Sequence, residues 1–269
     1  MNFLNGAIPT DLGALPSLQL LDLSENMLNG SIPAALGALP SLRYLVLSRN
    51  LLSGTVPDEL GNISTLVFLH LSANNLSGVL PQRLGNLGNL KELSLFDNEF
   101  VGGLPPSFAD LKNLTYLHIE GNNFTGPIPE FIGNWKQLKS LSLIGNNFEG
   151  PIPNTFSLSN LSGLFISDLI GSSRGGQGFS FPNLSRMTSL RKLTLRNCSI
   201  SGPIPGYIGR FKSLTHLDLS SNNLTGEIPF FSNAQQLSNI YLSENMLNGS
   251  LPRWLADSKK ANVYVSFGR

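Results

Sequence analysis

The feature that most constrains this chain is an internal repeat of 24 residues. Leucines begin the same phrase six times at that spacing, at Leu18, Leu42, Leu66, Leu90, Leu114 and Leu138. The phrase reads L-x-x-L-x-L-x-x-N-x-L-x-G-x-I-P-x-x-L-G-x-L-x-x. A unit this short cannot bury its apolar side chains alone, so it must stack on its neighbours along the chain. The spacing therefore predicts a solenoid rather than a globular domain.

Each part of the phrase predicts one part of a coil. The L-x-L segment alternates with the period of a strand, so its positions two, four and six after the starting leucine should face outward. Gly30 and its equivalents are expected to permit close backbone approach, and the following proline should end the extended segment. We therefore predict an α/β leucine-rich-repeat solenoid, a curved right-handed superhelix. Its short parallel strands should line the concave face, and irregular or 3-10 turns the convex face.

The asparagine of the phrase predicts a buried ladder. Its amide can bond backbone groups at the corner where the chain leaves the strand. The single cysteine occupies the same position in one repeat, so we expect a buried structural thiol there, with a reactive thiol as the alternative. The expected ladder consists of Asn26, Asn50, Asn74, Asn98, Asn122, Asn146, Cys198, Asn222 and Asn245.

Beyond Leu138 the repeat loosens, with starts at Leu161, Leu190, Leu214 and Leu237. We expect one domain over residues 1–269, with about ten complete repeats between partial repeats at 1–17 and 261–269. Without polar caps at its ends, the chain is interpreted as a fragment of a longer protein or a truncated product. An irregular Gly/Ser-rich insertion at about 169–181 is interpreted as a tolerated surface loop, and a ligand pocket is the alternative.

Composition excludes several functions. The 18 Lys and Arg residues against 17 Asp and Glu give a net charge of +1, which does not favour nucleic acid or an anionic membrane. The sequence shows neither a signal peptide nor a transmembrane segment. It also lacks kinase motifs and a nucleophile elbow, so we expect no enzyme activity, no catalytic residue and no cofactor.

The I-P form of the phrase, as in residues 126–129 and 226–229, resembles the extracellular repeats of plant receptor-like serine/threonine kinases. Residues 164–169, 195–202 and 245–252 are similar to the subfamily with a malectin-like domain after the repeats. The resemblance implies an ectodomain at the cell surface that binds an extracellular ligand or a co-receptor with similar repeats. It also implies malectin-like, transmembrane and kinase parts that this chain lacks.

A group of apolar, aromatic and charged residues fills outward strand positions in the repeats that begin at Leu42 through Leu138. Aromatic side chains are common in binding sites, and we expect Phe68, Phe96 and Tyr116 to form a continuous surface. The alternative is ordinary strand propensity without a ligand. The predicted ligand-binding residues are Tyr44, Val46, Phe68, His70, Glu92, Phe96, Tyr116, His118, Glu120 and Ile144.

The three histidines, His70, His118 and His216, also fall on outward positions. His70 and His118 lie two strands apart, about 9.6 Å, which is too far for one zinc ion, so no metal is expected. They are interpreted as solvated surface residues, and a mild pH response is the alternative.

Ten N-x-[ST] sequons predict a secreted glycoprotein, although part of this pattern follows from the repeat itself. The sequons are Asn29, Asn62, Asn75, Asn113, Asn123, Asn160, Asn183, Asn197, Asn223 and Asn248.

We conclude from the sequence that the chain is the extracellular recognition module of a plant receptor-like kinase, which binds a peptide, glycan or protein on its concave face. One alternative is a secreted defence protein that inhibits a pathogen enzyme such as a polygalacturonase, although flanking cysteine pairs are missing. A truncated receptor fragment is the other.

Overall fold

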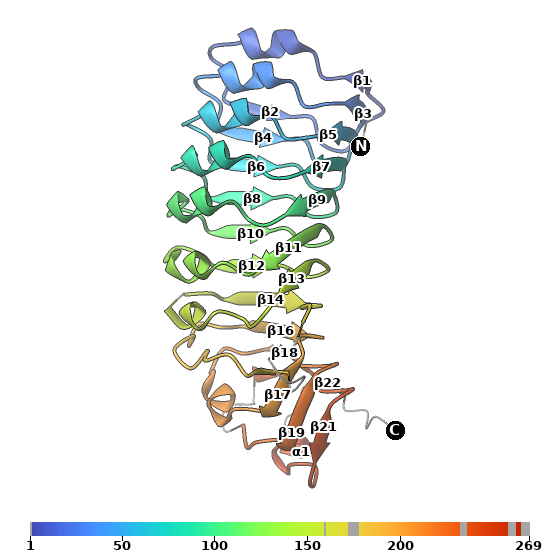
Figure 1. The fold of residues 1–269 in the computed structure, drawn as a ribbon, viewed down its shortest axis with the longest axis vertical. Coiled ribbons are helices and arrows are strands. Elements are labelled where there is room, and N and C mark those ends of the chain that lie inside the picture. The colour runs from blue at the N-terminus through green and yellow to red at the C-terminus, as the bar shows by residue number, and fades with distance from the viewer. Residues whose placement is uncertain (1, 159, 172–177, 232–235, 258–261, 265–269) are drawn as a thin grey trace. The chain divides into compact units, whose positions relative to one another are not determined.

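The computed structural model describes residues 2–158, 160–171, 178–231, 236–257 and 262–264 (Figure 1). The chain forms two compact units. Unit 1 comprises Met1–Thr125 with Trp135–Leu138, and unit 2 comprises Gly126–Asn134 with Lys139–Arg269.

The primary sheet of each unit consists of the L-x-L strands, which pair in parallel. In unit 1 the register joins Leu21, Leu45, Leu69, Leu93 and Leu117, all of them buried. These strands are β2 (Leu20–Asp22), β4 (Tyr44–Val46), β6 (Phe68–His70), β8 (Glu92–Ser94) and β10 (Tyr116–His118). Those of unit 2 are β12 (Ser140–Ser142), β14 (Gly163–Ser167), β16 (Lys192–Arg196), β18 (His216–Asp218), β20 (Asn239–Tyr241) and β22 (Asn262–Tyr264).

A second strand in most repeats was not anticipated from the sequence. It follows the ladder position, where the L-x-G stretch alternates like a strand and pairs with its neighbours in a secondary sheet. In the first half of the chain these strands are β1 (Asn5–Ala7), β3 (Met27–Gly30), β5 (Leu51–Gly54), β7 (Asn75–Gly78), β9 (Glu99–Gly102) and β11 (Asn123–Pro127). In the second half they are β13 (Asn147–Glu149), β15 (Phe179–Ser180), β17 (Ile200–Pro203), β19 (Asn223–Glu227) and β21 (Met246–Asn248).

Short 3-10 helices close most coils, as the repeat predicts. In most of them a proline precedes the first helical residue, where its fixed φ suits the turn. They are η1 (Thr10–Ala14), η2 (Ala34–Ala38), η3 (Asp58–Asn62), η4 (Gln82–Asn86), η5 (Pro106–Asp110), η6 (Glu130–Asn134), η7 (Asn154–Leu158) and η8 (Gly206–Arg210). A single α-helical turn, α1 (Trp254–Asp257), completes the described helices.

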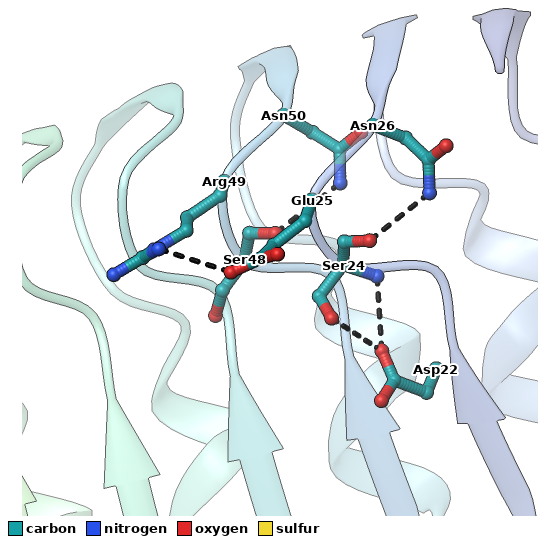
Figure 2. Close-up of polar contacts among 7 residues, drawn as sticks. All are labelled: Asp22, Ser24, Glu25, Asn26, Ser48, Arg49 and Asn50. Atoms are coloured by element: carbon teal, nitrogen blue, oxygen red, sulfur yellow. Dashed lines mark hydrogen bonds and ion pairs between the residues drawn. The ribbon is translucent and has the colours of Figure 1, made fainter. Parts of the chain in front are cut away.

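The asparagine side chains bond the corners of successive coils. The Asn98 Nδ2 donates to the carbonyls of Leu71, Leu95 and Phe96 at 3.1, 3.0 and 3.3 Å. Its Oδ1 accepts the buried N–H of Leu76 at 3.0 Å. Figure 2 shows Asn26 and Asn50 at the same corner of the first repeats. The amide therefore serves both as a donor and as an acceptor in a place that water does not reach.

The ladder changes in unit 2. The repeat that begins at Leu161 carries Leu169 at the ladder position, and Cys198 follows in the next repeat. The Cys198 side chain is fully buried, and its thiol donates to the Arg196 carbonyl at 3.2 Å. Burial raises the pKa of the Cys198 thiol far above its ordinary value. A thiol held neutral in this way is a poor nucleophile, which favours the structural role.

The glycines require one correction. A Cβ on Gly30 would meet only the Ala7 side chain, at 3.6 Å, so close approach does not explain this residue. Its φ of 76° does, because glycine adopts left-handed backbone without strain. Close approach is instead the reason for Gly37, where a Cβ would lie against the backbone carbonyl of Glu59 in the next coil. Gly13, Gly61 and Gly85 are crowded by backbone in the same way.

The residue before each ladder asparagine has left-handed backbone, whatever its side chain. Glu25, Arg49, Ala73 and Asp97 have φ between 54° and 58°, and Gly121 takes the same position at 64°. Figure 2 shows two of these residues, Glu25 and Arg49, joined by an ion pair of 3.0 Å. The turn before the ladder therefore imposes a conformation that costs an ordinary residue about 1 kcal/mol.

We expect Ala73→Gly to raise the free energy of unfolding by about 0.5–1 kcal/mol, because glycine relieves the left-handed strain. Urea denaturation followed by circular dichroism measures the change. Ala34→Gly, at the start of η2, is the control and should lower stability by a similar amount. Equal losses in both variants would show that the strain at residue 73 has no energetic weight.

Candidate functional site

The candidate site is the open face of the primary sheet in unit 1. Its outward side chains form three rows across the strands. Because the strands pair in register, each row follows the order of the repeats. The rows are Leu20–Tyr44–Phe68–Glu92–Tyr116, Asp22–Val46–His70–Ser94–His118 and Ser24–Ser48–Ser72–Phe96–Glu120.

An aromatic pair and an ion pair lie side by side on β4, β6 and β8. The rings of Tyr44 and Phe68 stack with centroids 5.0 Å apart and an interplanar angle of 24°. The His70 ring meets Phe68 edge-on at 5.8 Å. The His70 Nε2 lies 3.3 Å from the Glu92 Oε2, and both side chains are 29% exposed. We call these four residues, Tyr44, Phe68, His70 and Glu92, the aromatic–acidic patch.

The expected continuous aromatic surface of Phe68, Phe96 and Tyr116 is wrong. Glu92 is the Cα partner of both Phe68 and Tyr116, so a carboxylate separates the two rings. Phe96 lies in the third row, beyond Ser72, and stacks on neither ring among the described contacts. The aromatic part of the site is therefore the Tyr44–Phe68 pair, with Tyr116 apart from it.

Apart from Val46, the remaining predicted residues lie at the end of unit 1 or in unit 2. Tyr116 is 41% exposed and meets the His118 ring edge-on at 6.2 Å. The Oε2 of Glu120 is buried and has no hydrogen-bond partner within the described residues. Ile144 belongs to unit 2, so the structure does not place it in the same site. Val46, on β4, is half-buried in the second row, between Asp22 and His70.

Acidic residues, but no lysine or arginine, occupy the described outward positions on this face. In the described residues of unit 1, acids occupy three outward positions, Asp22, Glu92 and Glu120, and no lysine or arginine occupies any. Asp22 accepts hydrogen bonds from the Ser24 N–H and hydroxyl at 2.9 and 2.6 Å, as Figure 2 shows. Figure 2 also shows that this carboxylate is held within its own repeat. Glu92 and Glu120 are thus the acids available to a ligand with a positive charge.

The histidines take part in ring contacts and ion pairs. Among the described residues, no cluster of three or more His, Cys, Asp or Glu side chains could hold a metal ion. His216, in unit 2, lies with its ring centroid 5.4 Å from that of Tyr241. Burial lowers the pKa of His216; Asp218 opposes this shift and Lys192 adds to it. Its neutral form is therefore favoured in the folded protein.

All ten sequon asparagines are exposed. Three of them already use their amides: Asn113 donates to the Gly88 carbonyl at 2.8 Å, Asn197 donates to Asp168 at 2.8 Å, and the Asn183 Oδ1 accepts from the Ser185 hydroxyl at 2.8 Å. Residues 172–177, the centre of the predicted insertion, lie outside the described residues, as do 261 and 265–269 of the predicted final partial repeat.

Comparisons with known proteins agree with this architecture. Leucine-rich-repeat family models match residues 3–52, 63–124, 137–171 and 188–233. A probable leucine-rich-repeat receptor-like serine/threonine-protein kinase of Arabidopsis thaliana is 52% identical over 63 residues, which are 23% of this chain and 6% of that protein. The chain thus spans a small part of the length of this curated relative.

Two of the similar solved structures cover most of this chain. The Arabidopsis receptor kinase HAESA, in complex with the peptide hormone IDA and the co-receptor SERK1, is 38% identical with a TM-score of 0.87. The similarity covers 95% of this chain and 42% of that one. A plant ice-binding protein is 32% identical with a TM-score of 0.77, over 91% of this chain and 78% of that one. No helix among the described residues is long and apolar enough to cross a membrane. With its repeats, paired parallel strands and 3-10 turns, the chain belongs to the leucine-rich-repeat proteins.

Proposed function

We propose that this chain is the extracellular recognition module of a plant receptor-like kinase and that its aromatic–acidic patch binds a peptide. The observation that carries the proposal is the stacked Tyr44–Phe68 pair beside the His70–Glu92 ion pair on an open sheet face. The solved complex of HAESA with a peptide hormone and a co-receptor supports this class of ligand and partner.

The chemistry of the patch defines the peptide further. Half-buried rings favour an apolar or aromatic side chain, because such contacts contribute most of the binding energy at hot spots. Glu92 and Glu120 favour a basic group, because they place negative charge on a face whose described positions carry no lysine or arginine. The expected ligand therefore carries an apolar anchor and a lysine, an arginine or a free amino terminus.

Selection of a displayed library of linear peptides on the immobilised chain tests this proposal. We expect the selected peptides to be enriched in basic residues and to bind Phe68→Ala with a loss of about 2 kcal/mol. Glu92→Gln should remove the preference for basic residues. Phe230→Ala, which truncates a ring 71% exposed in unit 2, is the matched control and should bind normally. Selected peptides that bind both patch variants as tightly as the unmodified chain would rule out this site.

Two finer assignments complete the proposal. The parent protein carries a malectin-like domain after the repeats, for which residues 164–169, 195–202 and 245–252 provide the support. The exposed sequons carry N-linked glycans, as expected at the cell surface.

A further inference from the structure

A groove of about 520 Å³ lies at the beginning of the primary strands in unit 1, outside the aromatic–acidic patch. Its polar and charged lining comes from four successive repeats. The residues that matter are Gln19, Ser41, Arg43, Val67, Asn89 and Lys91. None of them was singled out in the sequence, because each lies one to three residues before an outward strand position. We call this feature the strand-start groove.

The floor of the groove is a continuous backbone ladder. The N–H of Arg43 donates to Gln19, that of Val67 to Arg43, and that of Lys91 to Val67, each at 2.8 Å. The N–H of Thr115 continues the ladder to Lys91 at 2.7 Å. Neighbouring residues of such a ladder lie about 4.8 Å apart, so Arg43 and Lys91 stand about 9.6 Å apart with Val67 between them.

The charge of the groove is positive and uncompensated. No acid lines it, and in the described part of the chain neither Arg43 nor Lys91 forms an ion pair. Both side chains are exposed. The nearest acid in the sequence, Glu92, is paired with His70 instead. Two cations that face solvent from one groove, without an acid to neutralise them, favour a ligand with at least two negative charges.

The backbone and the neutral side chains of the groove favour an anionic polymer with hydroxyl groups over an anionic peptide. A peptide is usually bound through free backbone groups or apolar side-chain pockets, and this groove offers a fully paired ladder and only Val67 and Pro40 as apolar lining. Groups that bond hydroxyls are present instead. Gln19 and Ser41 make no side-chain hydrogen bond to the described residues, and Asn89 keeps its Oδ1 after donating to the Ser64 carbonyl at 2.9 Å.

We propose that the strand-start groove binds a linear polysaccharide that carries carboxylates, such as a polyuronate. Arg43 and Lys91 bind carboxylates on sugars about two strand spacings apart, and Gln19, Ser41 and Asn89 bond the hydroxyls between them. The groove spans about 14 Å along the ladder, which fits a short oligosaccharide. This second site shares no residue with the aromatic–acidic patch, although Arg43, Val67 and Lys91 directly precede Tyr44, Phe68 and Glu92 in the sequence.

Unit 2 repeats the same pattern on its own ladder. Lys139 and Arg191 occupy the position one residue after the starting leucine, and Ser162 lies between them. The Ser162 N–H donates to Lys139, and that of Arg191 donates to Ser162, both at 2.8 Å. Lysine or arginine therefore occupies this position in every second repeat from Arg43 to Arg191, whereas the described outward positions of unit 1 carry no lysine or arginine. This alternation supports a function at the strand-start position itself.

Binding of a defined galacturonic acid oligomer to the chain, measured by calorimetry, tests the proposal. The Arg43→Gln/Lys91→Gln variant should bind about tenfold more weakly, because two charge-assisted hydrogen bonds are lost. Arg83→Gln/Arg210→Gln removes the same charge from exposed 3-10 helices and should leave binding unchanged. Arg43→Lys/Lys91→Arg keeps the charges and should retain most of the affinity. Added salt should weaken binding by the unmodified chain.

Two further ligands test whether the groove requires both the carboxylates and the hydroxyls of the polymer. A fully methyl-esterified oligomer lacks the charges and should not bind. Polyglutamate of similar length carries the charges without sugar hydroxyls and should bind at least about tenfold more weakly than the uronate. The proposal is overturned if polyglutamate binds as tightly as the uronate, if the double glutamine variant binds normally, or if the uronate does not bind at all. Peptide selection on the aromatic–acidic patch is unaffected by any of these results, so the two sites succeed or fail separately.

Discussion

Replacing Asn98 with alanine is expected to lower the free energy of unfolding by about 3 kcal/mol. The three carbonyls that the Asn98 amide bonds each keep another donor: Asn74 for Leu71, Asn122 for Leu95 and Ala73 for Phe96. The buried N–H of Leu76 keeps none, because Asn98 Oδ1 is its acceptor. An orphaned buried donor and the space left by the amide together account for the loss.

Urea denaturation followed by circular dichroism measures this effect. The matched control is Asn86→Ala at the end of η4, where the side chain is exposed and makes no hydrogen bond to the described residues. It should change stability by less than about 0.5 kcal/mol. If the two alanine variants were equally stable, the ladder would contribute no more than a surface amide.

Adding one methyl group at Gly61 is expected to cost about 3 kcal/mol as well, for a steric reason. A Cβ at this buried position in η3 would lie against the backbone carbonyl of Arg83 in the next coil. The neighbour that must move is backbone rather than the end of a flexible side chain. Gly61→Ala therefore forces two packed coils apart, and the transition in urea should shift to a lower concentration.

Gly88→Ala is the control for this change. A Cβ on Gly88 has no heavy atom within 4 Å, and its backbone is outside the left-handed region. Alanine there should be neutral or stabilise the chain by up to about 1 kcal/mol, because it restricts the unfolded chain. Similar losses at both glycines would mean that the coils adjust freely and that their separation is not fixed by this contact.

The sequence predicted the features in which one side chain has one task in every repeat. Leu21 and Leu45 occupy a buried strand position, which requires an apolar side chain. Asn98 occupies a corner that requires both a hydrogen-bond donor and an acceptor, which an amide supplies. Such requirements recur at a fixed spacing and can be read from a single chain. The left-handed turn before the ladder could not, because Glu25, Arg49 and Ala73 all adopt it, and glycine marks it at Gly121 and Gly145.

The candidate site was predicted less well. The rows follow from the repeat, so the position of Glu92 between Phe68 and Tyr116 was available in the sequence. A glutamate at this position interrupts the aromatic surface, and the prediction of a continuous surface did not include it. The stacking of Tyr44 on Phe68 and the approach of His70 to Glu92 depend on side-chain rotamers, which a repeat pattern does not specify. The sequence did not predict the strand-start groove, because only the backbone ladder places the surface residues Arg43 and Lys91 in one row.

The asparagine ladder also has a direction. In every described bond between coils, the amide reaches back to the preceding repeat: Asn50 to Leu23 and Leu28, Asn98 to Leu71 and Leu76, Asn222 to Leu195 and Ile200. The ladder asparagine of each coil thus completes the hydrogen bonds of the preceding coil. Among the described bonds, it forms none of this kind with the following coil. Fraying should consequently spread toward the amino terminus, each lost coil exposing the amide proton of the one before it to exchange.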